Sequence, residues 1–127
     1  MRLLALPGSY AVCRLDPAAR FPAWAGAAPG DELWSATRTA AELSVVCPDR
    51  RVPDGIRAER GFRAFAVAGP LDFSAIGILA ALTQPLAAAS ISLIAISTFD
   101  TDYLLVRDAD RPRAIAAWRA AGHQVDG

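Results

Sequence analysis

The spacing of apolar residues changes several times along the second half of the chain. Residues 62–68 (FRAFAVA) alternate large and small side chains and lead into GPLD, which predicts a strand followed by a turn. Ser74 suits the N-cap of a following helix. Large apolar residues then recur at helical spacing over residues 78–86, and a β-branched run with serines follows at residues 91–98. The pattern therefore predicts a buried helix between two strands, with the second strand also buried.

A hairpin and a second helix are predicted after this strand. FDTD is a turn sequence, and YLLVR at residues 103–107 is the expected returning strand. In the next segment Asp110 suits a helix N-cap, Pro112 the first turn, and Gly122 the left-handed position after the helix end. Residues 124–125 form a short terminal strand. The order β-α-β-β-α-β from residue 62 predicts a ferredoxin-like α+β unit whose helices cover one face of an antiparallel sheet.

The first half of the chain is expected to hold more strand and less helix. SYAVCRL, LWSATRT and ELSVVCP are predicted strands, and residues 56–60 are a fourth that runs into Phe62 without a flexible linker. FPAWAGAAPG, rich in alanine and proline, predicts a loop or a short distorted helix. We therefore expect two small units packed rigidly together, residues 1–60 with a reduced first helix and residues 61–127.

Residues 73–99 carry no charged side chain over 27 positions, which raises the question of a membrane span. Gln84 and Pro85 lie near the middle of this run, and aspartates rather than arginines flank it. The change from helical to strand periodicity also argues against one continuous helix. We interpret the run as protein core and expect no membrane association.

The segment ISLIAIS is apolar at nearly every position, whereas a strand with one exposed face alternates with polar residues. The second face of its sheet therefore needs cover from the first unit, from a second copy of the chain, or from both. This requirement leads us to expect a homodimer.

Composition excludes several classes of partner. The 13 basic and 13 acidic residues cancel, and no block of like charge favours nucleic acid or an anionic bilayer. All 13 basic residues are arginine, which suggests a GC-rich bacterial genome. The start MRLLALPG is too short for a secretory signal, and Cys13 and Cys47 lie in apolar runs as reduced core thiols do. We expect a cytoplasmic protein whose cysteines can pair only if their strands are neighbours.

The acids of ISTFDTD, Asp100 and Asp102, are the main candidates for chemistry. They suit a turn, a metal site or the polar end of a ligand pocket. A metal site needs more ligands nearby, and the sole histidine, His123, follows Gly122 as a helix-end residue. Because no clustered acid, base or nucleophile motif is present, we expect no metal, no cofactor and no enzymatic activity.

Several of these segments resemble one known family. PLDFSAIGILAALTQPLAAASISLIAISTFDTDYLLVRDAD resembles the second ACT domain of small bacterial proteins with two tandem ACT-type domains. That family is similar to the regulatory domains of aspartate kinase and to the animal cytosolic arginine sensor. LPGSYAVCRLDP, PAW, TRTAAELSVVCP and VPDG extend the resemblance to the first half, so the resemblance implies two packed ACT-type domains.

The resemblance implies a ligand site between the helix start and the end of the second strand, because ACT domains bind amino acids at domain interfaces. Unpaired N–H groups and the helix dipole favour a carboxylate at the helix start, and Gly77 lets a ligand approach the backbone. Asp102, more than Asp100, offers a carboxylate to an ammonium or guanidinium group. The predicted ligand-binding residues are Gly77, Ile78, Leu79, Ser97, Thr98, Phe99 and Asp102.

In function, the resemblance implies a non-catalytic regulatory module that binds a small-molecule amino acid. A protein-interaction or dimerisation module with a vestigial pocket is the alternative. The chain has no Gly-rich phosphate loop, so a kinase activity is not implied. Ser74, Ala75 and Ile76 stand where the arginine sensor carries acidic residues just before its glycine, so arginine specificity is not implied either.

Overall fold

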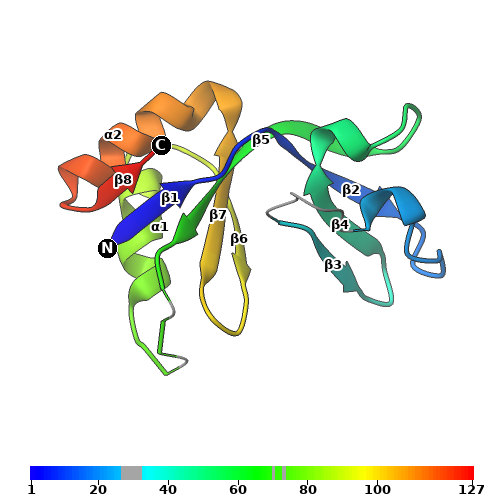
Figure 1. The fold of residues 1–127 in the computed structure, drawn as a ribbon, viewed down its shortest axis with the longest axis horizontal. Coiled ribbons are helices and arrows are strands. Elements are labelled where there is room, and N and C mark those ends of the chain that lie inside the picture. The colour runs from blue at the N-terminus through cyan, green and yellow to red at the C-terminus, as the bar shows by residue number, and fades with distance from the viewer. Residues whose placement is uncertain (27–32, 70, 73) are drawn as a thin grey trace. The chain divides into compact units, whose positions relative to one another are not determined.

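The computed structural model describes residues 1–26, 33–69, 71–72 and 74–127, and the chain divides into two compact units. Unit 1 consists of Met1–Leu6 and Arg63–Gly127, and unit 2 of Pro7–Phe62 (Figure 1). The domains predicted from sequence divide between residues 60 and 61, whereas these two units divide after Phe62 and join Met1–Leu6 to the second half of the chain.

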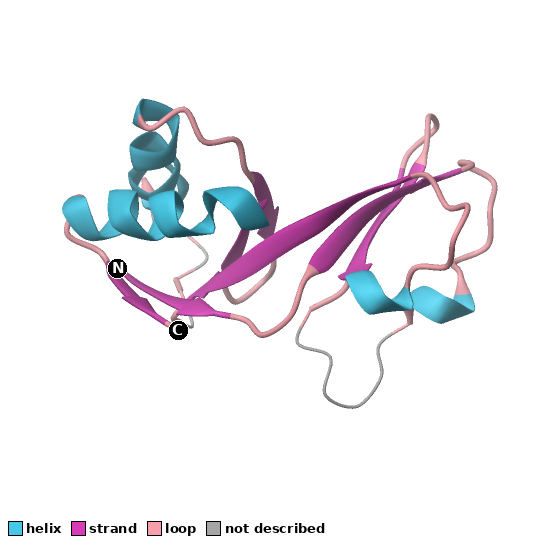
Figure 2. Ribbon diagram, turned by 90° about the horizontal axis from the view of Figure 1, so that it is seen from above, coloured by secondary structure: helices cyan, strands magenta, loops and turns pink. Residues whose placement is uncertain are grey.

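Unit 1 holds both α-helices, and they lie on the same face of its strands (Figures 1 and 2). Its neighbouring strands follow the order β8-β1-β5-β7-β6. The succession β5-α1-β6-β7-α2-β8 confirms the α+β element order predicted from residue 62. The elements are β1 (Arg2–Ala5), β5 (Ala58–Val67, of which Arg63–Val67 lies in this unit), α1 (Ile78–Ala88), β6 (Ile94–Ser97), β7 (Asp102–Arg107), the 3-10 turn η3 (Asp108–Asp110), α2 (Arg111–Ala120) and β8 (Gln124–Asp126).

Strand β1 is the element that the sequence pattern did not predict. It runs antiparallel to β5, with Leu3 opposite Val67, and parallel to β8, with Leu3 opposite Val125. The Leu3 side chain is fully buried in the core of this unit. The first strand of the chain therefore separates β5 from β8, and it is held by two strands that are distant in sequence.

Trp118 joins the two helices and the sheet of unit 1. Its side chain is fully buried, and its Nε1 donates a hydrogen bond of 2.8 Å to the Leu82 carbonyl of α1. Its ring packs edge-on against Phe65 of β5, with ring centroids 4.9 Å apart. Its indole N–H is thus paired, as a buried donor requires.

Helix α1 contains Pro85, which has no N–H to donate to the Ala81 carbonyl one turn earlier. The Nε2 atom of His123 lies 3.2 Å from that carbonyl oxygen and supplies the missing donor. After the helix, Ser90 takes a left-handed conformation with φ of 58°, which turns the chain toward β6. His123 is therefore a structural residue at this helix, in line with its predicted place past a helix end.

Within the uncharged run, residues 78–88 form α1 and residues 94–97 form β6, and no helix in the described part of the chain is long and apolar enough to cross a membrane. The strand predicted at residues 91–98 is shorter than expected. Strand β6 covers only Ile94–Ser97, and in the single chain its residues alternate between half-buried and exposed. The reason is position, since β6 pairs with β7 alone and forms an edge of its sheet.

Unit 2 contains the four strands predicted for the first half, in the neighbour order β3-β4-β2-β5. Its described elements are β2 (Tyr10–Leu15), the 3-10 turn η1 (Ala23–Ala25), β3 (Ser35–Arg38), β4 (Leu43–Pro48), the 3-10 turn η2 (Asp49–Arg51) and the start of β5. Two 3-10 turns stand where a split βαβ unit has helices. FPAWAGAAPG forms η1 in its described part, and its last four residues lie outside the described residues.

Candidate functional site

The start of helix α1 is set by Gly77, which precedes Ile78 with φ of 81°. This left-handed conformation is one that glycine adopts at little cost. The first intrahelical hydrogen bond runs from the Ala81 N–H to the Gly77 carbonyl, so the N–H groups before Ala81 have no partner within the helix. The first turn holds no acidic residue, and no side chain caps it. The helix therefore presents unpaired donors and the positive end of its dipole.

The sequence prediction of Ser74 as the helix N-cap is wrong. Ser74 donates from its backbone N–H and its hydroxyl to the Asp72 carboxylate, at 3.0 and 2.8 Å, and forms a separate turn before the helix. These two hydrogen bonds, the backbone one first, hold the pKa of the exposed Asp72 carboxyl below its usual value. Asp72 therefore remains ionised near neutral pH.

The β6–β7 hairpin holds the second half of the site in a defined shape. The Ser97 hydroxyl donates to Oδ1 of Asp102 at 2.5 Å, and the Thr98 N–H donates to the Thr101 carbonyl at 2.8 Å. The Thr101 hydroxyl donates to the Val67 carbonyl of β5 at 2.6 Å. The hairpin is thereby fixed to the centre of the sheet, with Asp102 at the first residue of β7.

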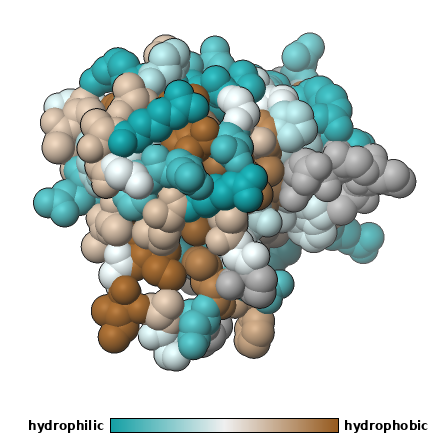
Figure 3. Space-filling model, turned by 60° about the vertical axis from the view of Figure 1, so that its left-hand side comes forward, coloured by the Kyte–Doolittle hydropathy of each residue, from teal (hydrophilic) through white to brown (hydrophobic). Residues whose placement is uncertain are grey.

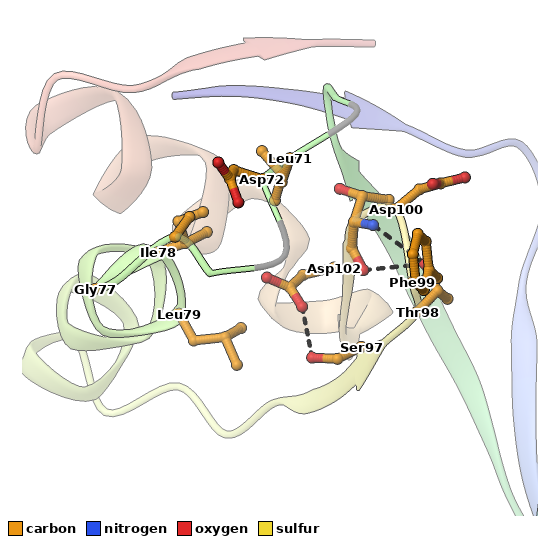
Figure 4. A pocket seen from close by; sticks show the side chains of 12 residues that line it. Leu71, Asp72, Gly77, Ile78, Leu79, Ser97, Thr98, Phe99, Asp100 and Asp102 are labelled. Carbon is orange, nitrogen blue, oxygen red and sulfur yellow. Dashed lines mark hydrogen bonds between the residues drawn. The ribbon is translucent and has the colours of Figure 1, made fainter.

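A cavity of about 300 Å³ lies between the start of α1 and this hairpin (Figure 4). Each of the seven residues predicted from sequence lines it, so the structure brings the whole predicted set together. Asp100, the less favoured of the two candidate aspartates, also lines the cavity. Sequence reasoning missed further lining residues, for which the GPLD turn and the FDTD hairpin were the available signals. These are Leu71, Asp72, Ala75 and Thr101.

Leu71 links the two sides of the cavity. Its N–H donates a hydrogen bond of 2.7 Å to the Asp100 carbonyl of the hairpin. This contact explains why the segment before α1 and the FDTD turn reach the same cavity, although about thirty residues separate them. It also gives Asp100 a structural role through its backbone, while its side chain stays exposed.

The two sides of the cavity offer groups of opposite electrostatic character. Unpaired helix donors lie on one side, and the carboxylate of Asp102 lies on the other, held by Ser97. Its volume is at the lower end of small-molecule pockets and equals about ten water molecules in the liquid, which suits a metabolite of amino-acid size. The described lining includes three acids and no basic residue, so a bound group that faces the hairpin should be cationic.

Two large hydrophobic side chains are exposed at this end of unit 1. Ile76, directly before Gly77, is 96% exposed, and Phe99, which lines the cavity, is 79% exposed. Hydrophobic surface also appears elsewhere on this side of the molecule, between hydrophilic patches (Figure 3). Exposed apolar side chains beside a cavity are typical of a surface that a ligand or a partner covers.

Metal binding finds no support among the described residues, which contain no group of three histidine, cysteine or acidic side chains placed to hold an ion. His123 is occupied by the Ala81 carbonyl, and the Asp102 carboxylate by Ser97. The cavity therefore offers binding groups, and the described residues around it include no histidine, cysteine or lysine that would act as a nucleophile or proton carrier.

Comparison with known proteins identifies the family. Residues 57–119, which include α1, β6, β7 and nearly all of α2, match the model of the ACT domain. A protein from Agobacterium tumefaciens, known from its crystal structure, shares 37% sequence identity with this chain. The two structures superpose with a TM-score of 0.91 over 98% of this chain and 91% of that protein. The chain belongs to the family of this protein and carries an ACT domain. The predicted ACT domain is thereby confirmed for the second half of the chain.

The ACT domain lies in the half that holds the cavity, whereas residues 8–55 match a different family model, described as an N-terminal domain. Aspartate kinase from Synechocystis shares the fold at 17% identity and a TM-score of 0.63, with 98% of this chain and 27% of the kinase covered. The regulatory subunit of aspartate kinase from Thermus thermophilus does so at 9% identity and a TM-score of 0.59, with 90% of this chain and 92% of that one covered. No curated protein matches.

Proposed function

We propose that the protein is a non-catalytic, cytoplasmic regulatory module that binds a free amino acid in the cavity beside α1. One observation carries the proposal. The helix N–H groups of Gly77, Ile78 and Leu79, which have no partner within the helix, lie on one side of the cavity, and the Asp102 carboxylate lies on the other. An α-carboxylate suits the helix start, and an α-ammonium suits Asp102. The presence of an ACT domain and the fold shared with a regulatory subunit of aspartate kinase support a regulatory use.

The wider proposal is that both halves derive from ACT-type domains in tandem, as in the small bacterial proteins that the sequence resembles. The succession of strands and 3-10 turns in unit 2 supports this origin for the first half. We place the ligand at an interface, because Ile76 and Phe99 leave apolar surface exposed beside the cavity. Binding there would couple ligand occupancy to association of the covering surface by linkage.

A thermal-shift screen of the standard amino acids tests the binding function. At least one amino acid is expected to raise the melting temperature, since a ligand at 100 times its dissociation constant adds about 2.7 kcal/mol of stability. The amide of the same amino acid is the control, because it lacks the carboxylate that the helix start holds. If no amino acid shifts the transition at millimolar concentration, ligand binding by this cavity is excluded.

The second candidate is a dimerisation module with an unused pocket, and the sheet face opposite the helices favours it. Leu104 and Val106 of β7 belong to the core beneath the helices. Their neighbours Tyr103 and Leu105 therefore point to the opposite face of the sheet. On β6, Ile96 lies opposite Tyr103 and Ile94 lies opposite Leu105, so both isoleucines share that face. Ile94, Ile96 and Tyr103 are only half-buried there. A sheet face that is exposed to solvent normally carries polar residues, so this apolar face is expected to be covered by another protein surface. A second copy of the chain is the simplest candidate for that surface.

Light scattering tests the homodimer. The wild-type protein is expected to have twice the chain mass at micromolar concentration, and Ile96→Asp is expected to shift it toward the monomer by placing a charge on the apolar face. Ala95→Asp is the matched control, because Ala95 is exposed and lies on the alternate face. A monomeric wild type removes the dimer hypothesis, and a dimer that persists in Asp102→Ala without any bound amino acid favours the second candidate over the first.

A further inference from the structure

Two hydrogen bonds fasten the FDTD turn to the chain around the end of β5, and Gly69 lies between them in the sequence. Before Gly69, the Val67 carbonyl accepts the Thr101 hydroxyl at 2.6 Å. After it, the Leu71 N–H donates to the Asp100 carbonyl at 2.7 Å. Leu71, Asp100 and Thr101 all line the cavity, so these two hydrogen bonds help to hold its walls in place.

Gly69 has no room for a side chain beside the second of these hydrogen bonds. A Cβ atom added to Gly69 would lie 2.9 Å from the Leu71 nitrogen and 3.4 Å from the Asp100 carbonyl oxygen. The first distance is well inside the normal separation of non-bonded atoms, and a backbone atom cannot turn aside as the end of a side chain does. Gly69 is not among the described glycines with positive φ, so space and not backbone conformation requires glycine here.

Gly77, the other glycine at the cavity, differs from Gly69 in this respect. Its φ is 81°, and a Cβ atom added to it would meet nothing within 4 Å. Gly77 therefore serves the start of α1 through its backbone conformation. Gly69 serves the cavity through the close approach of two other backbone segments.

We propose that Gly69 is a positioning residue of the candidate site, because its lack of a side chain lets the segment before α1 reach the FDTD turn. With alanine at this position, the Leu71 nitrogen has to move away from the added carbon, and its hydrogen bond to Asp100 lengthens or opens. The Thr101 hydroxyl and the Val67 carbonyl are not among the three atoms nearest to that carbon, so the hairpin stays fastened to β5. The change therefore separates two walls of the cavity and leaves the sheet intact.

Amide hydrogen exchange of the ligand-free protein, followed by nuclear magnetic resonance, tests the proposal. The Leu71 amide of Gly69→Ala is expected to exchange at least about tenfold faster than that of the wild type, because its hydrogen bond is weakened. The amides of Phe65 and Leu104, which lie in buried strands, should exchange at unchanged rates. Equal exchange at Leu71 in the two proteins, or a wild-type Leu71 amide as fast as an unbonded one, would overturn the proposal. Loss of the folded circular dichroism spectrum, or of protection at Phe65 and Leu104, would also overturn it, since Gly69 would then support the fold and not the site.

Gly26→Ala is the matched control, because it makes the same substitution where a side chain fits. Gly26 has φ of −66°, and a Cβ atom there would lie 3.5 Å from the Ala23 carbonyl oxygen, which is an ordinary contact. Gly26 belongs to unit 2 and does not line the cavity. The general effect of alanine on the unfolded chain is shared by both variants. A change at the Leu71 amide in Gly26→Ala equal to that in Gly69→Ala would contradict the role of the close contact.

The effect on binding rests on the proposed function, and a thermal-shift panel of the standard amino acids at millimolar concentration measures it. Each amino acid that raises the melting temperature of the wild type should bind Gly69→Ala at least about tenfold more weakly by calorimetry, because the walls that hold it are displaced. Gly26→Ala should bind it within about twofold of the wild type. An unchanged affinity in Gly69→Ala, despite faster exchange at Leu71, would remove Gly69 from the site. If no amino acid shifts the wild type, the binding function fails, whereas the exchange comparison still decides whether Gly69 holds the two walls together.

Discussion

Replacing Trp118 with alanine is expected to lower the free energy of unfolding of unit 1 by about 3–5 kcal/mol. The side chain is fully buried, contacts Phe65 edge-on at 4.9 Å and donates its indole N–H to the Leu82 carbonyl. The substitution leaves a large cavity between α1, α2 and β5 and also removes the indole donor to the Leu82 carbonyl. Urea unfolding followed by far-ultraviolet circular dichroism measures the loss, which is a large fraction of the stability of a domain of this size.

Two further variants separate packing from hydrogen bonding at this position. Trp118→Phe keeps most of the volume and loses the donor to Leu82, so we expect a smaller loss of about 1–3 kcal/mol. Trp34→Ala is the surface control, because Trp34 is 41% exposed and its ring lies 5.2 Å from the exposed Phe21 ring. A loss for Trp34→Ala equal to that for Trp118→Ala would show that buried volume does not govern the stability of this fold.

The elements of the second half could be predicted from sequence because their signals are local. Helical spacing, a proline in the first turn and a glycine after the last one place α2 within a residue or two of its observed bounds. The strand β7 is a continuous apolar run that begins at a polar turn, and it is buried at Leu104, Leu105 and Val106. In these segments local preference and tertiary packing favour the same structure.

Other features depend on contacts that no local pattern reports. Strand β1 is four residues long, and its pairing with β5 and β8 decides both its existence and its membership of unit 1. The apolar composition of β6 predicted burial, but its edge position leaves half of its residues exposed in the single chain. The helix cap is Gly77 and not Ser74, which the sequence predicted, because the Ser74 hydroxyl donates to the Asp72 carboxylate and does not cap a helix N–H.

The residues of the candidate site were easier to predict from sequence than the pairing of the strands. The cavity lies between the start of α1 and the end of β6. These two elements follow each other directly in the chain, so a single α-β unit brings both sides of the cavity together. What the sequence did not supply was the segment before α1, where Leu71 is tied to the Asp100 carbonyl. This contact links a turn to a hairpin about thirty residues away, and only the folded structure brings them together.

Asp102→Asn is expected to weaken amino-acid binding by about 10- to 100-fold, which corresponds to the loss of a charge-assisted hydrogen bond of roughly 1.5–3 kcal/mol. The amide keeps the size of the carboxylate and an oxygen that can accept from Ser97, so the hairpin should remain in place. What is removed is the negative charge opposite the helix start. Isothermal titration calorimetry with the amino acid found by the screen measures the change in dissociation constant.

Asp100→Asn is the matched control, because Asp100 lines the same cavity and belongs to the same turn. Its contribution to the structure is the backbone carbonyl that accepts from Leu71, which the substitution leaves intact. Affinity should therefore change by less than about threefold, as expected for a charge that solvent screens. Equal losses in both variants would assign the effect to the net negative charge of the hairpin, whereas a loss confined to Asp100→Asn would place the ligand's ammonium on the other aspartate. An unchanged affinity in Asp102→Asn would remove this residue from the binding site, since its carboxylate is the one that faces the helix start from β7.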